Sequence, residues 1–232
     1  MIELKNISKS YGRVEALRSV NVDLDVGIYA LLGPNGSGKT TLMKIISGLL
    51  TPSGGQVLYN GTEIKKMGPV YRSKIGYMPQ YPAVYPSFAV KEFLLYCAEL
   101  KALGEGSESQ IDRLLDKTEL SDVYDRRISE LSGGMKQRLS LCAAVLGDPE
   151  ILILDEPTAG LDPKQRAALR RFVKEISPGK LIIWATHIVP DVEKTANGII
   201  FMKKGVAAVT GNDAGNGETL EEKYLSFFGD VL

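Results

Sequence analysis

The sequence has no long run of apolar residues. None of its apolar stretches approaches the ~20 residues that a helix needs to cross a bilayer. The first residues, Met1 to Lys5, also lack the apolar segment of a secretory signal peptide. We therefore expect a soluble chain, so that any membrane span used in its function belongs to another chain.

The sequence also has no excess of charge of either sign and only two cysteines. The 28 Lys and Arg residues equal the 28 Asp and Glu residues in number, which leaves only a local basic patch open as a nucleic-acid contact. The two cysteines, Cys97 and Cys142, are far apart and belong to no metal-type cluster. They predict two buried, reduced thiols, which fits a cytosolic chain.

Several glycines, in contrast, lie together in one short motif. The stretch from Gly33 to Thr41, GPNGSGKTT, matches the pattern G-x-x-x-x-G-K-[ST] between an apolar strand (28–32) and a predicted helix (41–49). Glycines let several backbone N–H groups converge on one anion, and the helix start adds its positive end. We expect Lys39 to reach the β- and γ-phosphates and Thr40 to ligate Mg²⁺. The stretch predicts nucleotide binding but not its purpose.

Acidic residues follow a second apolar strand. Asp155 and Glu156 come directly after residues 151–154, and His187, the only histidine, follows the apolar run 181–185. Neighbouring residues at a strand end point differently, so one carboxylate can hold a metal while the other activates a water. A lone histidine is more often structural, but its place in the same row as Asp155 favours contact with the γ-phosphate or the attacking water.

A second glycine-rich helix start lies at Leu131 to Arg138, LSGGMKQR. Ser132 and the glycines can open a helix and hold an anion, although an ordinary capped helix has the same pattern. One chain seldom needs two such helix ends for one γ-phosphate, so this end is expected to serve the nucleotide of another subunit. Gln80, just after the strand 75–78, can ligate Mg²⁺ or hold a water.

The patterns predict an α/β fold: a P-loop NTPase core of mixed, largely parallel sheet, with an antiparallel β subdomain and an inserted α-helical subdomain. We expect the core in 1–80 and 148–210, the insertion in 81–147, and a flexible linker (211–217) with a C-terminal helix in 211–232. The other expected strands are 2–7, 20–24, 56–59, 62–64, 199–203 and 206–210. The other expected helices are 90–103, 111–117, 134–146, 163–176 and 189–196.

Together these motifs, in this order and spacing, resemble an ATP-binding cassette (ABC) ATPase over essentially the whole chain. The resemblance implies ATP and Mg²⁺ as cofactors and a head-to-tail dimer with two ATPs between the subunits. It also implies a separate transmembrane permease, and therefore a peripheral position at the cytoplasmic face of the cell membrane. No nucleic-acid partner is expected.

The resemblance assigns a role to each motif residue. Glu156 is the catalytic base, His187 the switch histidine, Asp162 part of the loop crossing the dimer interface, and Tyr11 the adenine-stacking aromatic. Taken alone, Tyr11 would be interpreted as a surface or packing residue. The catalytic set is Glu156, His187 and Gln80, and the metal set is Thr40, Gln80 and Asp155. The nucleotide-binding set is Tyr11, Gly33, Pro34, Asn35, Gly36, Ser37, Gly38, Lys39, Thr40, Thr41, Ser132, Gly133, Gly134 and Asp162.

One residue departs from the family pattern, because Met135 stands where the family usually has glutamine. Ser132 and Gly134 are intact, so full competence is expected. The LSGGMKQR wording, the T-H-I sequence after the strand and the short chain look like the ATPase subunits of drug, antibiotic and lantibiotic-type exporters. The alternatives are an importer ATPase subunit, a soluble ABC ATPase acting on ribosomes or DNA, and a small-molecule phosphate-loop kinase.

Overall fold

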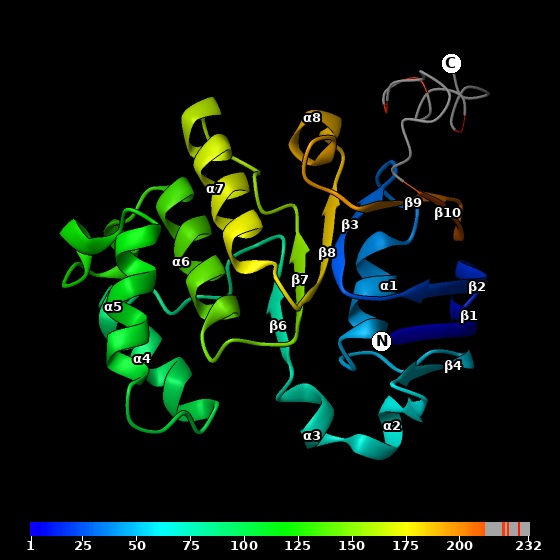
Figure 1. The fold of residues 1–232 in the computed structure, drawn as a ribbon, viewed down its shortest axis with the longest axis horizontal. Helices are drawn as coiled ribbons and strands as arrows, with labels where there is room; N and C mark the ends of the chain where they lie inside the picture. Colours follow the sequence, from blue (N-terminus) through cyan, green and yellow to red (C-terminus); the bar gives the residue numbers. More distant parts are fainter. Residues whose placement is uncertain (212–219, 221, 223–226, 228–232) are drawn as a thin grey trace.

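Two β-sheets enclose the first long helix. The computed structural model describes residues 1–211, 220, 222 and 227. The smaller sheet is antiparallel, in the order β2-β1-β4-β5, and comprises β1 (Ile2–Tyr11), β2 (Val14–Leu24), β4 (Gly54–Tyr59) and β5 (Thr62–Glu63). Helix α1 (Lys39–Ile46) lies between this sheet and the larger one (Figure 1).

The larger sheet has the strand order β10-β9-β3-β8-β7-β6. Its strands are β3 (Gly27–Leu32), β6 (Ile75–Met78), β7 (Ile151–Asp155), β8 (Leu181–Thr186), β9 (Gly198–Lys203) and β10 (Val206–Gly211). All neighbours are parallel except β9 and β10. Every residue of β7 and β8 is buried, because packed layers cover both faces of these interior strands.

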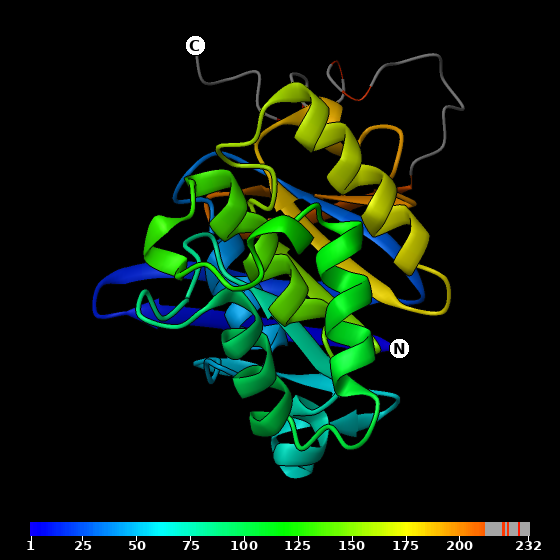
Figure 2. The same cartoon turned by 90° about the vertical axis from the view of Figure 1, so that its left-hand side faces the viewer.

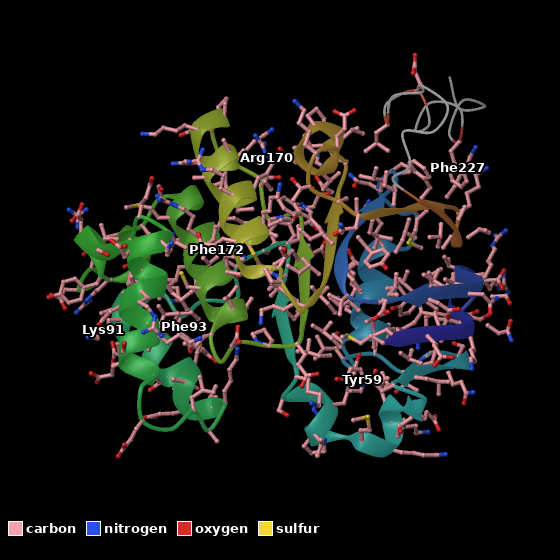
Figure 3. The ribbon with its side chains drawn as sticks, in the orientation of Figure 1. Tyr59, Lys91, Phe93, Arg170, Phe172 and Phe227 are labelled. Carbon is pink, nitrogen blue, oxygen red and sulfur yellow. The ribbon has the colours of Figure 1, made fainter. Side chains whose placement is uncertain are left out.

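A group of helices covers the other face of the larger sheet (Figures 1 and 2). They are α4 (Val90–Leu100), α5 (Ser107–Lys117), α6 (Gly133–Val145), α7 (Pro163–Ile176) and α8 (Val189–Val192). Phe93 of α4 and Phe172 of α7 belong to the apolar cluster between these helices and the sheet (Figure 3). The short helices α2 (Ile64–Met67) and α3 (Pro69–Arg72), and the 3₁₀ turns η1 (Ser121–Val123) and η2 (Ile128–Glu130), complete the described elements.

The predicted fold class is confirmed, with several shifted boundaries. Strand β1 extends through Tyr11 and β2 begins at Val14, which the sequence pattern left open, because the two strands pair with each other as far as Tyr11 and Val14. The helix expected over 189–196 is wrong beyond Val192. Asn197 donates its N–H to the Ile28 carbonyl at 2.6 Å and accepts the Ile28 N–H at 2.7 Å, and these bonds tie the chain to β3.

Several other expectations also need correction. Helix α5 begins at Ser107, four residues before the expected start at residue 111, and α2 and α3 were not expected at all. Both cysteines are free, but only Cys142 is buried, while Cys97 is half-buried. The linker was expected from Gly211, but Gly211 ends β10. Residues 212–217 and most of the expected C-terminal helix lie outside the described residues, although Leu220, Glu222 and Phe227 are helical. None of the described helices is long and apolar enough to span a membrane.

Candidate active site

The glycine-rich loop joins β3 to α1 at the carboxyl end of the larger sheet. A Cβ atom on Gly33 would lie 2.3 Å from the Met202 carbonyl oxygen, so the backbone passes too close to β9 for any side chain. Gly38 caps α1 with a φ of 108° in the left-handed region. These two glycines let the loop fold back over the start of α1, where backbone N–H groups are unpaired within the helix.

The Lys39 side chain lies inside this loop. Its ammonium donates to the Gly33 carbonyl at 2.6 Å and to the Pro34 carbonyl at 3.3 Å, and the residue is 7% exposed. Burial lowers the pKa of this ammonium, while the carboxylates of Glu156 and Asp155 act in the opposite direction. A cation held this way by neutral carbonyls is well placed to exchange them for phosphate oxygens.

Thr40 and Asp155 meet across 115 positions of sequence. The Thr40 hydroxyl donates to Asp155 Oδ2 at 3.1 Å. Asp155 ends β7 and is 2% exposed, and burial raises the pKa of its carboxyl above the usual value, partly offset by the Thr40 hydrogen bond. The pair therefore presents a hydroxyl oxygen and a carboxylate oxygen side by side.

Glu156 and His187 form a second pair at the ends of neighbouring strands. His187 Nδ1 lies 2.9 Å from Glu156 Oε1, while Glu156 Oε2 is buried with no described partner. Asp155 and Glu156 therefore point to different partners, as expected for adjacent residues. The Thr186 hydroxyl accepts the Ile188 N–H at 3.0 Å and fixes the turn that carries His187.

An ion pair anchors the helix that follows His187. Arg170 of α7, labelled in Figure 3, donates to Asp191 Oδ1 at 2.9 Å, and Asp191 is 2% exposed. Removing Arg170 would leave the buried Asp191 carboxylate without its ion-pair partner, so this pair connects α8 to α7. The segment that carries His187 is thereby held at both ends.

The residues of this site fit a nucleoside triphosphate and Mg²⁺. Ser37 Oγ in the loop is buried without a described partner, as is Glu156 Oε2, and a polar ligand would satisfy both. Mg²⁺ prefers oxygen ligands and uses one or two protein groups together with phosphates and waters. Thr40 and Asp155 supply such a set. The described residues hold no cluster of three or more His, Cys, Asp or Glu residues that would suit a metal held by protein alone.

The second glycine-rich helix start lies elsewhere on the chain surface. Ser132 caps α6 by accepting the Met135 N–H at 3.3 Å, and Ser132 and Gly133 are exposed. None of the described hydrogen bonds joins residues 132–134 to residues 33–41. Gly134 instead lies against α7 and its preceding loop, where an added Cβ would be 3.2 Å from Gln165 Oε1 and from Leu161.

The remaining predicted site residues are exposed. Gln80 lies two residues beyond the end of β6, which is the edge strand of the larger sheet and pairs with β7. Tyr11 is half exposed at the tip of the β1–β2 hairpin, with the Lys9 ammonium 5.5 Å from its ring centroid. Asp162 caps α7 by accepting the Gln165 N–H at 2.9 Å.

Sequence reasoning gave no role to one residue of the assembled site. Gln137 of α6 is 4% exposed and donates from Nε2 to the backbone carbonyl of Glu156 at 3.0 Å. Gln137 is four positions before the buried Leu141 and therefore lies on the core face of α6. A polar residue on an otherwise apolar face was the sequence signal that could have identified it.

The fold and this site together define a class. A glycine-rich loop at a strand–helix junction of a parallel sheet, with a Thr–Asp pair and a carboxylate beside it, is the arrangement of a P-loop nucleoside triphosphatase. Residues 17–159 match the ABC transporter family, and the chain belongs to this family as an ATP-binding, ATP-hydrolysing subunit.

Known proteins similar to the chain agree with this assignment. The lantibiotic transport ATP-binding protein SrtF of Streptococcus pyogenes is 35% identical over 226 residues, covering 97% of this chain and 96% of its own. A solved ATP-binding subunit of an ABC transporter has a TM-score of 0.90 at 30% identity, over 98% of this chain and 99% of its own. The dimeric, post-hydrolysis cassette MJ0796 bound to ADP and Pi has a TM-score of 0.85 at 26% identity, over 92% and 99%.

Proposed function

We propose that the chain powers an ABC exporter by closing around ATP as a head-to-tail dimer, hydrolysing it and reopening. The observation that carries this proposal is the distribution of the motifs. The loop of 33–41, the Thr40–Asp155 pair and the Glu156–His187 pair meet in one chain, whereas the exposed start of α6 bonds to none of the loop residues. A second copy would supply that helix start to the nucleotide.

The loop and the Thr40–Asp155 pair hold the nucleotide in this proposal. Backbone N–H groups of 33–41 and the Lys39 ammonium bind the phosphates, with Lys39 leaving the Gly33 carbonyl. Thr40 and Asp155 hold Mg²⁺, which would offset the charge that develops on the phosphates. Gln80 completes this metal site from the edge of the sheet, and Tyr11 stacks on the base.

Glu156 takes a proton from the attacking water in this proposal. Its Oε2 is buried and has no described partner, while Oε1 is occupied by His187. The histidine therefore fixes the carboxylate and leaves one oxygen as the base. His187 itself is 60% exposed, so its free nitrogen can reach a phosphate oxygen.

The partner copy completes the site in this proposal. Ser132, Gly133 and Gly134 of one subunit bind the γ-phosphate held by the other, and Asp162 lies in the loop that crosses between them. Support comes from the exposed Ser132 and Gly133 and from the dimeric state of the similar cassette MJ0796. Met135 presents its N–H to Ser132, a backbone contact that needs no glutamine side chain.

The membrane partner in this proposal is a separate transmembrane permease, which the chain binds at the cytoplasmic face of the membrane. We place its contact on the helical segment 81–147, which we treat as one subdomain hinged at Gln80, with the core in 1–80 and 148–210. Similarity to SrtF, whose name assigns it to lantibiotic transport, supports transport of a peptide-like cargo, and we propose export as its direction. The cargo itself is expected to be selected by the permease.

Replacing Glu156 by glutamine tests the proposed chemistry. Glu156→Gln keeps the shape of the side chain and removes the base, so ATP turnover is expected to fall by about 10²-fold or more while ATP binding persists. The variant should accumulate as an ATP-bound dimer in size-exclusion chromatography. Glu175→Gln, an exposed carboxylate paired with Lys117, is the matched control and should turn over ATP normally.

The same measurements separate the alternatives. Undiminished turnover in Glu156→Gln would contradict the role of Glu156. A phosphate acceptor required for ATP consumption would indicate a kinase instead. Salt-sensitive RNA or DNA binding would favour a soluble ribosome- or DNA-associated ATPase, and co-purification with an importing permease would overturn export.

A further inference from the structure

The backbone of Glu156 is held in an uncommon conformation. Its φ is +51°, in the left-handed region that costs a residue with a side chain about 1–2 kcal/mol. The Glu156 N–H donates to the Ala185 carbonyl of β8 at 2.9 Å, so one side of the peptide is tied to the sheet. Strain at a functional position persists only where the surroundings impose it.

The other side of this residue is tied to helix α6. The Glu156 carbonyl accepts two hydrogen bonds, from the Ala159 N–H and from Gln137 Nε2, both at 3.0 Å. The bond from Ala159 is local and closes a turn in the same loop. The bond from Gln137 comes from another element and is buried, so it fixes where the left-handed turn lies relative to α6.

Helix α6 contacts the far end of the same loop as well. The loop runs from Glu156 to Asp162, where α7 begins, and its Leu161 lies close to the Cα of Gly134 in the first turn of α6. Gln137 is one turn further along this helix. The loop is therefore held by α6 at both ends, through Gly134 and through Gln137.

We propose that Gln137 is a positioning residue for ATP hydrolysis. It holds the left-handed Glu156 from α6, so the carboxylate is aimed at the water site and the His187 pair is kept. Because Ser132 and Gly133 begin the same helix, the contact with a second copy's nucleotide and the aim of the chain's own Glu156 are linked through one rigid element. This inference rests on the proposed role of Glu156.

Removing the donor of the hydrogen bond tests the proposal. Gln137→Met keeps the length of the side chain, so the core stays filled while Glu156 loses its tie to α6. We expect kcat to fall by about tenfold with KM for ATP within about twofold of wild type, because Lys39 and Thr40 are untouched. In a Glu156→Gln background, Gln137→Met should leave the ATP-dependent dimer intact.

Two further variants keep the test decisive. Gln110→Met on α5 also removes a glutamine-to-backbone bond, the one accepting the Gly147 N–H at 3.0 Å, and should leave kcat unchanged. If Gln137→Met does not fold, Gln137→Asn, which is too short to reach the carbonyl, should give the same split between kcat and KM. Wild-type kcat in the folded Gln137 variants, alongside an inactive Glu156→Gln, would overturn the inference and leave the proposed function standing. An equal loss in Gln110→Met would show a purely structural effect.

Discussion

Buried charge sets the properties of the site at the scale of single residues. Asp155 and Glu156 are 2% and 5% exposed, and Lys39 is 7% exposed, yet few partners surround them. Burying a charge without full hydrogen bonding lowers the stability of the folded state. The site therefore holds its charged groups at a cost that bound phosphates and Mg²⁺ would relieve.

Asp155 allows this cost to be measured. Burial raises the pKa of its carboxyl, so the folded state binds the proton more tightly than the unfolded chain does. The charged carboxylate thus destabilises the fold near neutral pH, and the destabilisation fades as pH falls through the raised pKa. Asp155→Asn should raise the Tm of the ligand-free protein at about pH 7 and abolish hydrolysis that depends on Mg²⁺.

The pH dependence gives the check. The gap in Tm between Asp155→Asn and wild type, measured by calorimetry, should shrink as pH is lowered, because the wild-type carboxyl then becomes neutral too. Asp125→Asn removes an exposed carboxylate and should change Tm little. A difference in Tm that grows as the pH is lowered would contradict the conclusion that the charged Asp155 carboxylate destabilises the fold.

At the scale of secondary-structure elements, the N-termini of three helices contribute residues to the proposed site. Helix α1 starts under the glycine-rich loop, α6 starts at Ser132, and α7 starts at Asp162. Each start exposes backbone N–H groups that require acceptors. In α7 the requirement is met within the chain, because Asp162 and Gln165 cap each other reciprocally.

Asp162 therefore has a structural role beside its proposed place at the dimer interface, and the two can be separated. Asp162→Ala should lower stability by about 1 kcal/mol through loss of the cap. That loss corresponds to a fall in Tm of about 2–4 °C for a chain of this size, which thermal unfolding would detect.

A second substitution isolates the other role. Asp162→Ser keeps a capping oxygen and should restore the Tm. If Asp162 also acts across the interface, the serine variant should still lose ATPase activity. Full activity with a restored Tm would limit Asp162 to capping.

The whole molecule divides its apolar core between the two faces of the larger sheet. One cluster joins the small sheet and α1 to one face of the larger sheet, while the other joins the opposite face to helices α4 to α8. The glycine-rich loop leads into α1 on the first side, and α6, which carries Ser132, lies on the second. This separation within the chain is what makes a second copy necessary in the proposed mechanism.

Mixing two inactive variants tests that arrangement. Lys39→Ala retains an intact α6 start, and Ser132→Arg retains an intact loop. Neither should hydrolyse ATP alone, whereas an equal mixture should recover about a quarter of wild-type activity, because half of the dimers are mixed and each has one intact site of two. A mixture as inactive as its components would contradict sites shared between subunits.

The sequence by itself determined the local elements and the order of the motifs. The apolar runs of β7 and β8 identified buried strands, and Asp162-Pro163 fixed the start of α7 at the observed residue. Strand, loop and helix are encoded by residues close together in the chain, so their patterns could be interpreted directly.

Only the tertiary structure decided which side chains meet. The Thr40–Asp155 and Glu156–His187 pairs join residues 115 and 31 positions apart, and the parallel order β3-β8-β7 places them at one edge. The Gln137 bond to the Glu156 carbonyl also depends on the packing of α6 against the loop after β7. Such contacts follow from register and packing between distant segments, and no local pattern encodes them.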